Sequence, residues 1–230
     1  MIEFVNQNQH PRALALHQKY AKSLVLLDLV WTHCNIVADI VQQLLSSKYF
    51  DSSSINIPHA IQAALLHDIG VYCCGGFEWI PDQTPSEKPY IQHVVTGAKI
   101  LQKEGLDPVI VEAAYTHTGV GLTAQDIQNY GLNLPVQDLI PQTIEGQLVG
   151  YAAKFHSKTP KFKSKEHIIE SLNRYGKDKV EQFNKLLEFF GEPNLEKIKS
   201  KYEEWHKAFA YKTENLTQTG QVNLNSAGIN

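Results

Sequence analysis

The sequence has few cysteines, and this shortage excludes the classes of protein that depend on them. Only three cysteines occur in 230 residues, and the two that are close together, Cys73 and Cys74, are adjacent. An odd number of cysteines with one adjacent pair fits neither a disulfide framework nor a CxxC zinc site. Reduced thiols are therefore expected.

Positive charge and long apolar runs are also scarce. The chain has 21 Lys and Arg residues against 24 Asp and Glu residues, a net charge of −3, whereas a general nucleic-acid-binding protein carries a clear basic excess. No apolar run approaches the roughly 18 residues of a membrane span, and Met1-Ile2-Glu3-Phe4 lacks the layout of a signal peptide. We expect no general nucleic-acid binding, no membrane partner and a cytoplasmic location. The oligomeric state stays open.

Helical periodicity dominates the chain, with no convincing strand and no internal repeat. Residues 23–46 carry an apolar stripe that includes His33, and polar residues such as Asp28 and Asp39 lie opposite. The pattern predicts an all-α fold. Capping residues, prolines and glycines place the other helices at 11–20, 57–70, 89–104, 107–118, 123–131, 141–155, 168–175, 177–190 and 195–211.

The composition divides the chain into three parts. We expect a helical core over residues 1–158 and a C-terminal helical extension, packed on that core, over 159–212. Residues 213–230 are mainly Asn, Gln, Thr, Ser and Gly without periodicity, which predicts a disordered tail.

Four inward-facing positions on successive helices carry metal-competent side chains: His33, the His67-Asp68 pair, His93 and His117. Each buried imidazole needs hydrogen-bond partners, so this number is hard to explain by packing alone. Neutral imidazole and carboxylate groups are ligands of Zn, Fe, Mn and Co. Five ligands exceed the needs of one four-coordinate ion, which indicates two ions bridged by Asp68. A hydrogen-bonded polar core is the alternative.

The segment Leu66-His67-Asp68-Ile69-Gly70, with His33 before it and His93 and His117 after it, resembles the motif of the HD superfamily of metal-dependent phosphohydrolases. Residues 90–101 and 117–123 are similar to a small HDIG-type subfamily of single-domain proteins. The resemblance covers about residues 12–158. It implies an HD-domain helical bundle that binds metal within 1–158, with additional C-terminal helices.

The sequence departs from the family at one ligand. The last ligand of the family is an aspartate in a Tyr-Ala-Asp-Lys segment, whereas this chain has Tyr151-Ala152-Ala153-Lys154. In the family that aspartate joins the first histidine and the HD pair at the first metal, and alanine cannot ligate. Three explanations stay open: a deliberate replacement, a naturally degenerate member, or another group that fills the gap at Ala153.

The resemblance implies hydrolysis of a phosphate ester or anhydride by attack of a metal-bound hydroxide, on a nucleotide or a related small phosphorylated metabolite. His33, His67 and Asp68 would hold one ion, and Asp68, His93 and His117 the other. Asp68 and Lys154 are the expected catalytic residues. Lys154, Thr118 and Trp79 are the expected substrate contacts.

Each of these roles has a plainer alternative. Trp79 and Phe77 could form a packing cluster in the loop 71–88, and the five lysines of 154–165 could form a solvated surface loop. The HD fold also supports di-iron oxygenases, and a scaffold without catalysis could bind a nucleotide or a metal. The sequence leaves both functions open.

Overall fold

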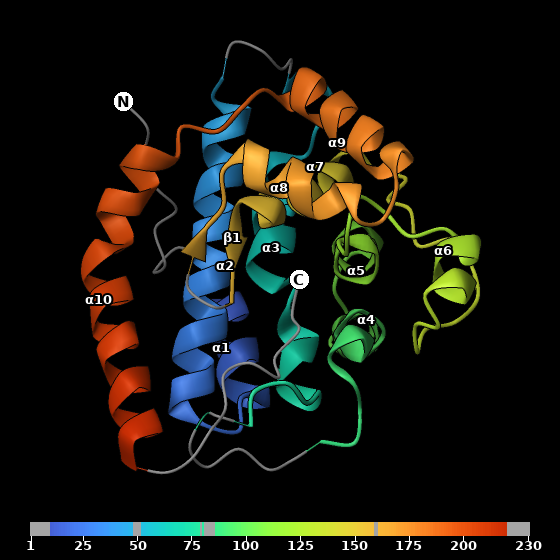
Figure 1. Ribbon diagram of the computed structural model, residues 1–230. Coiled ribbons are helices and arrows are strands. Elements are labelled where there is room, and N and C mark those ends of the chain that lie inside the picture. Colours follow the sequence, from blue (N-terminus) through green and yellow to red (C-terminus); the bar gives the residue numbers. More distant parts are fainter. Residues whose placement is uncertain (1–9, 48–51, 79, 81–85, 159–160, 220–230) are drawn as a thin grey trace.

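The computed structural model describes residues 10–47, 52–78, 80, 86–158 and 161–219, and it is all-α apart from one short hairpin (Figure 1). The α-helices are α1 (Pro11–Tyr20), α2 (Leu24–Leu45), α3 (Ile57–Leu66), α4 (His93–Lys103), α5 (Pro108–Thr116), α6 (Ala124–Asn129), α7 (Ile144–Ala152), α8 (Lys165–Asn173), α9 (Lys177–Phe190) and α10 (Leu195–Thr219). Short 3-10 helices are η2 (Ser52–Ser54), η3 (Ile69–Cys73), η4 (Tyr90–Gln92) and η5 (Ala153–Phe155).

The long helix α2 is the centre of the core. Ser23 caps its first turn by accepting a hydrogen bond from the backbone N–H of Leu26 at 3.1 Å, and the helix packs on α3 and α7. By length and composition α2 could cross a membrane, but 78% of its most apolar window is buried inside the fold. An apolar helix covered by other helices is a core helix.

Three other N-terminal caps follow the sequence prediction. Asn56 caps α3, Asp107 caps α5 ahead of Pro108, and Thr123 forms a capping box with Asp126 at α6. Each side chain satisfies a backbone N–H that has no partner within its own helix. These caps fix where α3 and α5 begin, and so how far their C-terminal ends reach toward α2.

Gly70 has a different function from the one expected. A glycine at the end of a helix usually forms a left-handed cap, and the predicted helix 57–70 ends at Gly70, but α3 ends at Leu66 and η3 follows. A Cβ atom at Gly70 would lie 2.0 Å from the carbonyl oxygen of His93 and 2.4 Å from the backbone nitrogen of Gly97. The two glycines therefore let η3 and α4 pack backbone to backbone.

The C-terminal helices pack on this core. Phe183 and Phe190 of α9 lie against Tyr151 of α7, with ring centroids 5.6 and 5.8 Å apart. In Figure 1, α10 stands alongside α2. Asp39 of α2, expected on an exposed polar face, is instead fully buried, and it accepts hydrogen bonds from the Tyr202 hydroxyl and from Lys201, both at 2.7 Å.

Two further expectations differ from the structure. A two-stranded antiparallel hairpin, β1 (His156–Ser157) with β2 (Lys161–Phe162), forms where no strand was predicted. The boundary between extension and tail was expected at residue 212. It falls inside α10, because this helix continues into the polar segment as far as Thr219. Residues 220–230 lie outside the described part of the chain.

Candidate metal centre

The five residues predicted as metal ligands come together where four helices meet. His33 lies in the middle of α2, His67 caps the end of α3 and Asp68 follows it, His93 begins α4, and His117 caps the end of α5. All five side chains are buried, and Asp68 is 0% exposed. The helix ends thus direct polar side chains into an otherwise apolar core.

The Asp68 carboxylate lies at the centre of this group. Its Oδ2 atom is 3.1 Å from Nε2 of His33 and 3.2 Å from Nε2 of His67. Its Oδ1 atom is 3.4 Å from Nε2 of both His93 and His117. The residues form two groups of three, each with ligand atoms within 4.8 Å of one another, and Asp68 belongs to both groups. We call these the first group (His33, His67, Asp68) and the second group (Asp68, His93, His117).

Backbone carbonyls fix the rings of three of these histidines. Nδ1 of His67, His93 and His117 donates to the carbonyl oxygen three residues earlier, at 2.7, 2.7 and 2.9 Å. In a neutral imidazole the other nitrogen, Nε2, then carries a lone pair. The Nε2 atoms of His93 and His117 lie 3.0 Å apart, and neither can donate to the other.

Buried lone pairs without donors indicate what the site can hold. Among the described residues, Nε2 of His33 and of His67 and Oδ1 of Asp68 have no hydrogen-bond partner. Such groups are costly to bury unless a cation or a donor reaches them. Imidazole and carboxylate donors, with the second ring nitrogen hydrogen-bonded, match the usual surroundings of a transition metal ion. The donor set therefore fits divalent metal.

The electrostatics keep the ligands in the required protonation states. Burial lowers the pKa of His33 and His117 to about 3 and that of His93 to about 4, so all three rings are neutral near pH 7. Burial alone would raise the pKa of Asp68, but Lys158 and the neighbouring histidines hold it well below its usual range. The site thus presents three neutral imidazoles, those of His33, His93 and His117, around an ionised carboxylate.

Comparison with known families now identifies the chain. Residues 30–158, more than half of the sequence, match the family model described as HD domain. The chain belongs to the HD domain family. All five predicted ligands lie within the matched residues, and membership supports a metal-dependent phosphohydrolase.

Relatives of this HD domain carry varied names. It is 39% identical over 89 residues to a tRNA (cytidine(56)-2'-O)-methyltransferase of Picrophilus torridus and 28% identical over 177 residues to the protein of the same name in Thermoplasma volcanium. The matches cover 39% and 76% of this chain but only 21% and 45% of those two proteins. An uncharacterized protein of Methanocaldococcus jannaschii is 27% identical over 64% of this chain and 77% of its own length.

Among solved structures, the HD domain is similar to the phosphodiesterase PgpH HD domain of L. monocytogenes. That match has a TM-score of 0.44 and 13% sequence identity, and it covers 76% of this chain and 95% of the other.

A lysine that the sequence analysis did not single out contacts the centre of the site. Lys158 donates to Oδ2 of Asp68 at 2.5 Å, and its Nζ atom lies 5.5 Å from the centroid of the Tyr90 ring. Burial opposes the charge of Lys158, but Asp68 and Tyr90 raise its pKa above the usual value. Lys158 directly follows β1, and the sequence carries no signal of that strand.

Three further residues singled out from the sequence lie around a cavity of about 500 Å³ that the site histidines also line. Lys154, Thr118 and Ala153 are in its wall together with Lys158 and the site histidines. Burial, then Lys163 and Lys158, lower the pKa of Lys154 to about 7. The lysine run is therefore not a solvated loop throughout, because three of its lysines line this cavity. Trp79 lies outside the described residues.

Ala153 begins η5 and presents a methyl group to the cavity, so it supplies no ligand atom. That the family has an aspartate at this position stays a prediction. Two histidines connected to His33 were also missed by the sequence analysis. Nδ1 of His156 in β1 lies 2.8 Å from Nδ1 of His33, and Nε2 of His206 in α10 lies 3.1 Å from Nε2 of His156. His156 lies in the lysine-rich run and His206 in an amphipathic helix, so neither stood out.

Proposed function

We propose that this HD domain hydrolyses a phosphate ester or anhydride with the help of two divalent transition metal ions, of Fe, Mn, Zn or Co. One observation carries the proposal: Asp68 is shared by two groups of buried ligands whose Nε2 lone pairs face its carboxylate. Bound divalent cations supply a water molecule of lowered pKa and stabilise charge on phosphoryl oxygens.

The chain's own residues have separate roles in this proposal. Asp68 is a ligand in both groups, and its low pKa keeps its carboxylate anionic. Lys158 is placed to neutralise a phosphoryl oxygen close to Asp68, since its ammonium group already lies at the carboxylate. Lys154 and Thr118, in the same wall, bind the phosphate from the side. Burial beneath the helices keeps bulk water from Asp68.

The cavity supports a nucleotide or a related small phosphorylated metabolite as the substrate. Its volume of about 500 Å³ lies within the range of small-molecule sites. Lys154, Lys158 and Lys163 give it positive charge, whereas Tyr130 and Tyr175 in the wall offer ring faces for a base or another planar group. Trp79, expected to contact the substrate, stays a prediction.

The names of the methyltransferase relatives do not extend to this chain in our proposal. Only 101 residues lie outside the matched range 30–158. The 177-residue match therefore includes much of the HD region while covering under half of the relative. We infer that the shared part is the metal-binding domain and that methyl transfer belongs to the rest of those proteins.

The test uses the full chain freed of metal by a chelator and reloaded with Mn²⁺, Zn²⁺, Fe²⁺ or Co²⁺ in turn. Phosphate release from a panel of nucleotides and other phosphorylated metabolites should depend on the metal and fall to background in Asp68→Asn. Oxygen consumption without phosphate release would overturn the proposal in favour of an oxygenase. Nucleotide binding without turnover would overturn it in favour of a binding protein.

The Ala153→Asp variant tests the missing ligand. His33 and His67 of the first group line the same cavity as Ala153. A carboxylate at position 153 should strengthen metal binding at that group by more than about tenfold, the least that loss of an outer-shell partner costs. Isothermal titration with Mn²⁺ measures the change, and Ala153→Asn is the uncharged control. Unchanged affinity in Ala153→Asp would show that the first group does not need this position.

A further inference from the structure

His33 differs from the other metal-site histidines in what holds its ring. The other three use a backbone carbonyl three residues earlier, near a helix end. His33 lies in the middle of α2, where the carbonyls are occupied by the helix's own hydrogen bonds. Its Nδ1 atom instead lies 2.8 Å from Nδ1 of His156.

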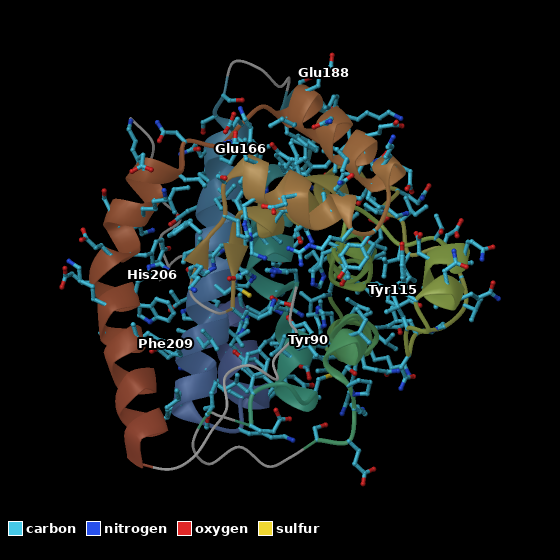
Figure 2. All side chains as sticks on the ribbon, in the orientation of Figure 1. Tyr90, Tyr115, Glu166, Glu188, His206 and Phe209 are labelled. Carbon is cyan, nitrogen blue, oxygen red and sulfur yellow. The ribbon has the colours of Figure 1, made fainter. Side chains whose placement is uncertain are left out.

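His156 is in turn connected to the C-terminal helix. Its Nε2 atom lies 3.1 Å from Nε2 of His206, and Nδ1 of His206 donates to the carbonyl oxygen of Tyr202 at 2.8 Å. Figure 2 shows His206 projecting from α10 toward α2. A carbonyl oxygen can only accept, so the proton of the neutral His206 ring is on Nδ1 and its Nε2 accepts.

The position of the proton on His206 determines where the protons of His156 and His33 lie. His156 donates from Nε2 to His206, so its Nδ1 accepts from Nδ1–H of His33. Nε2 of His33 is then left with a lone pair that faces Asp68. The reverse order would place two acceptors, Nδ1 of His206 and the carbonyl of Tyr202, 2.8 Å apart.

Without the hydrogen bonds that connect it to His156 and His206, His33 could adopt the other tautomer. Its Nε2 atom lies 3.1 Å from Oδ2 of Asp68, so a proton on Nε2 would make a charge-assisted hydrogen bond to the carboxylate. That proton would remove the lone pair that a metal needs. Phe162 of β2 packs on His156 and on His206, with ring centroids 4.9 and 5.3 Å away. This contact helps to shield the hydrogen bonds between the histidines from water.

We propose that His206, acting through His156, is a positioning residue that holds His33 in its Nδ1–H form and so presents Nε2 to a metal ion. The inference rests on the proposed metal centre. It adds His206 of α10 to the residues on which metal binding depends. This helix lies beyond the region 30–158 that matches the family model.

The first test measures metal affinity without any activity assay. Metal-free full-length chain is titrated with Zn²⁺ by calorimetry. His206→Ala should weaken one of the two zinc sites by about 10- to 100-fold, the usual cost of losing an outer-shell partner. His206→Gln, whose Oε1 atom can accept from His156, should restore most of the affinity. His167→Ala, an exposed histidine on α8, is the control and should leave both sites unchanged.

The second test reads the tautomer directly. Long-range ¹H–¹⁵N NMR of the metal-free wild-type chain should show His33 as the Nδ1–H form, and His206→Ala should shift it toward Nε2–H. A purely structural contribution of His206 would not change the tautomer. A wild-type His33 in the Nε2–H form overturns the inference even if His206→Ala does not fold. Equal zinc affinity in folded His206→Ala also overturns it, whereas a wild type that binds no zinc removes the metal centre itself.

Discussion

At the scale of single residues, the site is organised by Asp68, and most of its partners could be predicted from sequence. His33, His67, His93 and His117 were predicted because helical spacing places them on core faces, and the structure brings them together. Lys158 was not predicted as the lysine at Asp68. Its position follows from its place directly after β1 rather than from any periodic pattern, and nothing local distinguishes it from Lys154.

A buried histidine outside the metal centre, His17, should make the stability of the protein depend on pH. His17 is fully buried, and its ring bonds to the Tyr72 hydroxyl at 2.6 Å and to the Leu65 carbonyl at 2.7 Å. Burial lowers its pKa from 6.5 to about 4, although the Leu65 carbonyl opposes the shift. Between pH 6.5 and 4 the unfolded chain takes up a proton that the folded chain does not, so the free energy of unfolding falls as the pH falls.

The His17→Gln variant isolates this effect, because glutamine does not titrate. Urea unfolding at pH 7, 6, 5 and 4 should show the wild type losing about 3 kcal/mol more than the variant across that range, from roughly 1.4 kcal/mol per unit of pKa shift. Comparing the two chains at each pH removes the contribution of the other histidines. Parallel curves for the two proteins would contradict the prediction.

At the scale of elements, the contact between η3 and α4 brings the backbone of His93 against Gly70, two residues after Asp68. A glycine at position 70 could be noticed in the sequence, but its purpose could not be predicted. A left-handed cap is a local property, whereas the close approach to His93 and Gly97 depends on a helix that follows more than twenty residues later. Gly97, by contrast, lies inside a helix, where a close approach is the usual reason for a glycine.

Gly70→Ala should therefore disturb the second group of ligands. The added methyl group would meet the His93 carbonyl and the Gly97 nitrogen, both backbone atoms that cannot rotate away. Overpacking of this kind costs about 1–3 kcal/mol, and displacement of α4 moves His93 away from Asp68. Urea unfolding measures the first effect and Zn²⁺ titration the second.

Gly105→Ala is the matched control for this change. Gly105 has a φ of +67° and open space around its Cβ position, so alanine there costs about 1–2 kcal/mol of backbone strain without a clash. It should lower stability by a comparable amount and leave zinc affinity unchanged. Equal loss of zinc binding in both variants would mean that general destabilisation, and not the position of His93, weakens the site.

At the scale of the whole molecule, the C-terminal extension is connected to the metal-binding core through α2. Periodicity in residues 23–46 showed which face of α2 is polar but not what covers it. Asp28 accepts a hydrogen bond from Trp205 at 3.0 Å, and Asp39 one from Tyr202. His33 lies between these two positions on the same helix, so the docking of α10 sets where His206 meets His156.

Asp39→Ala should loosen α10 and weaken metal binding some distance away. The variant removes the acceptor of Tyr202 and Lys201, a loss of about 1–3 kcal/mol in the free energy of unfolding. Tyr202 also supplies the carbonyl that fixes the His206 ring. Backbone amides of α10 should exchange faster with deuterium, and zinc affinity at the first group should fall although Asp39 contacts none of its ligands.

Asp126→Ala provides the comparison. Asp126 forms a similarly buried ion pair with Lys179, at 2.6 Å, between α6 and α9. Its loss should cost comparable stability but leave both the exchange of α10 and the zinc affinity of the first group unchanged, because α6 and α9 carry none of His33, His156 and His206. If Asp39→Ala accelerated exchange in α10 without any loss of zinc affinity, α10 would stabilise the fold without acting on the metal centre.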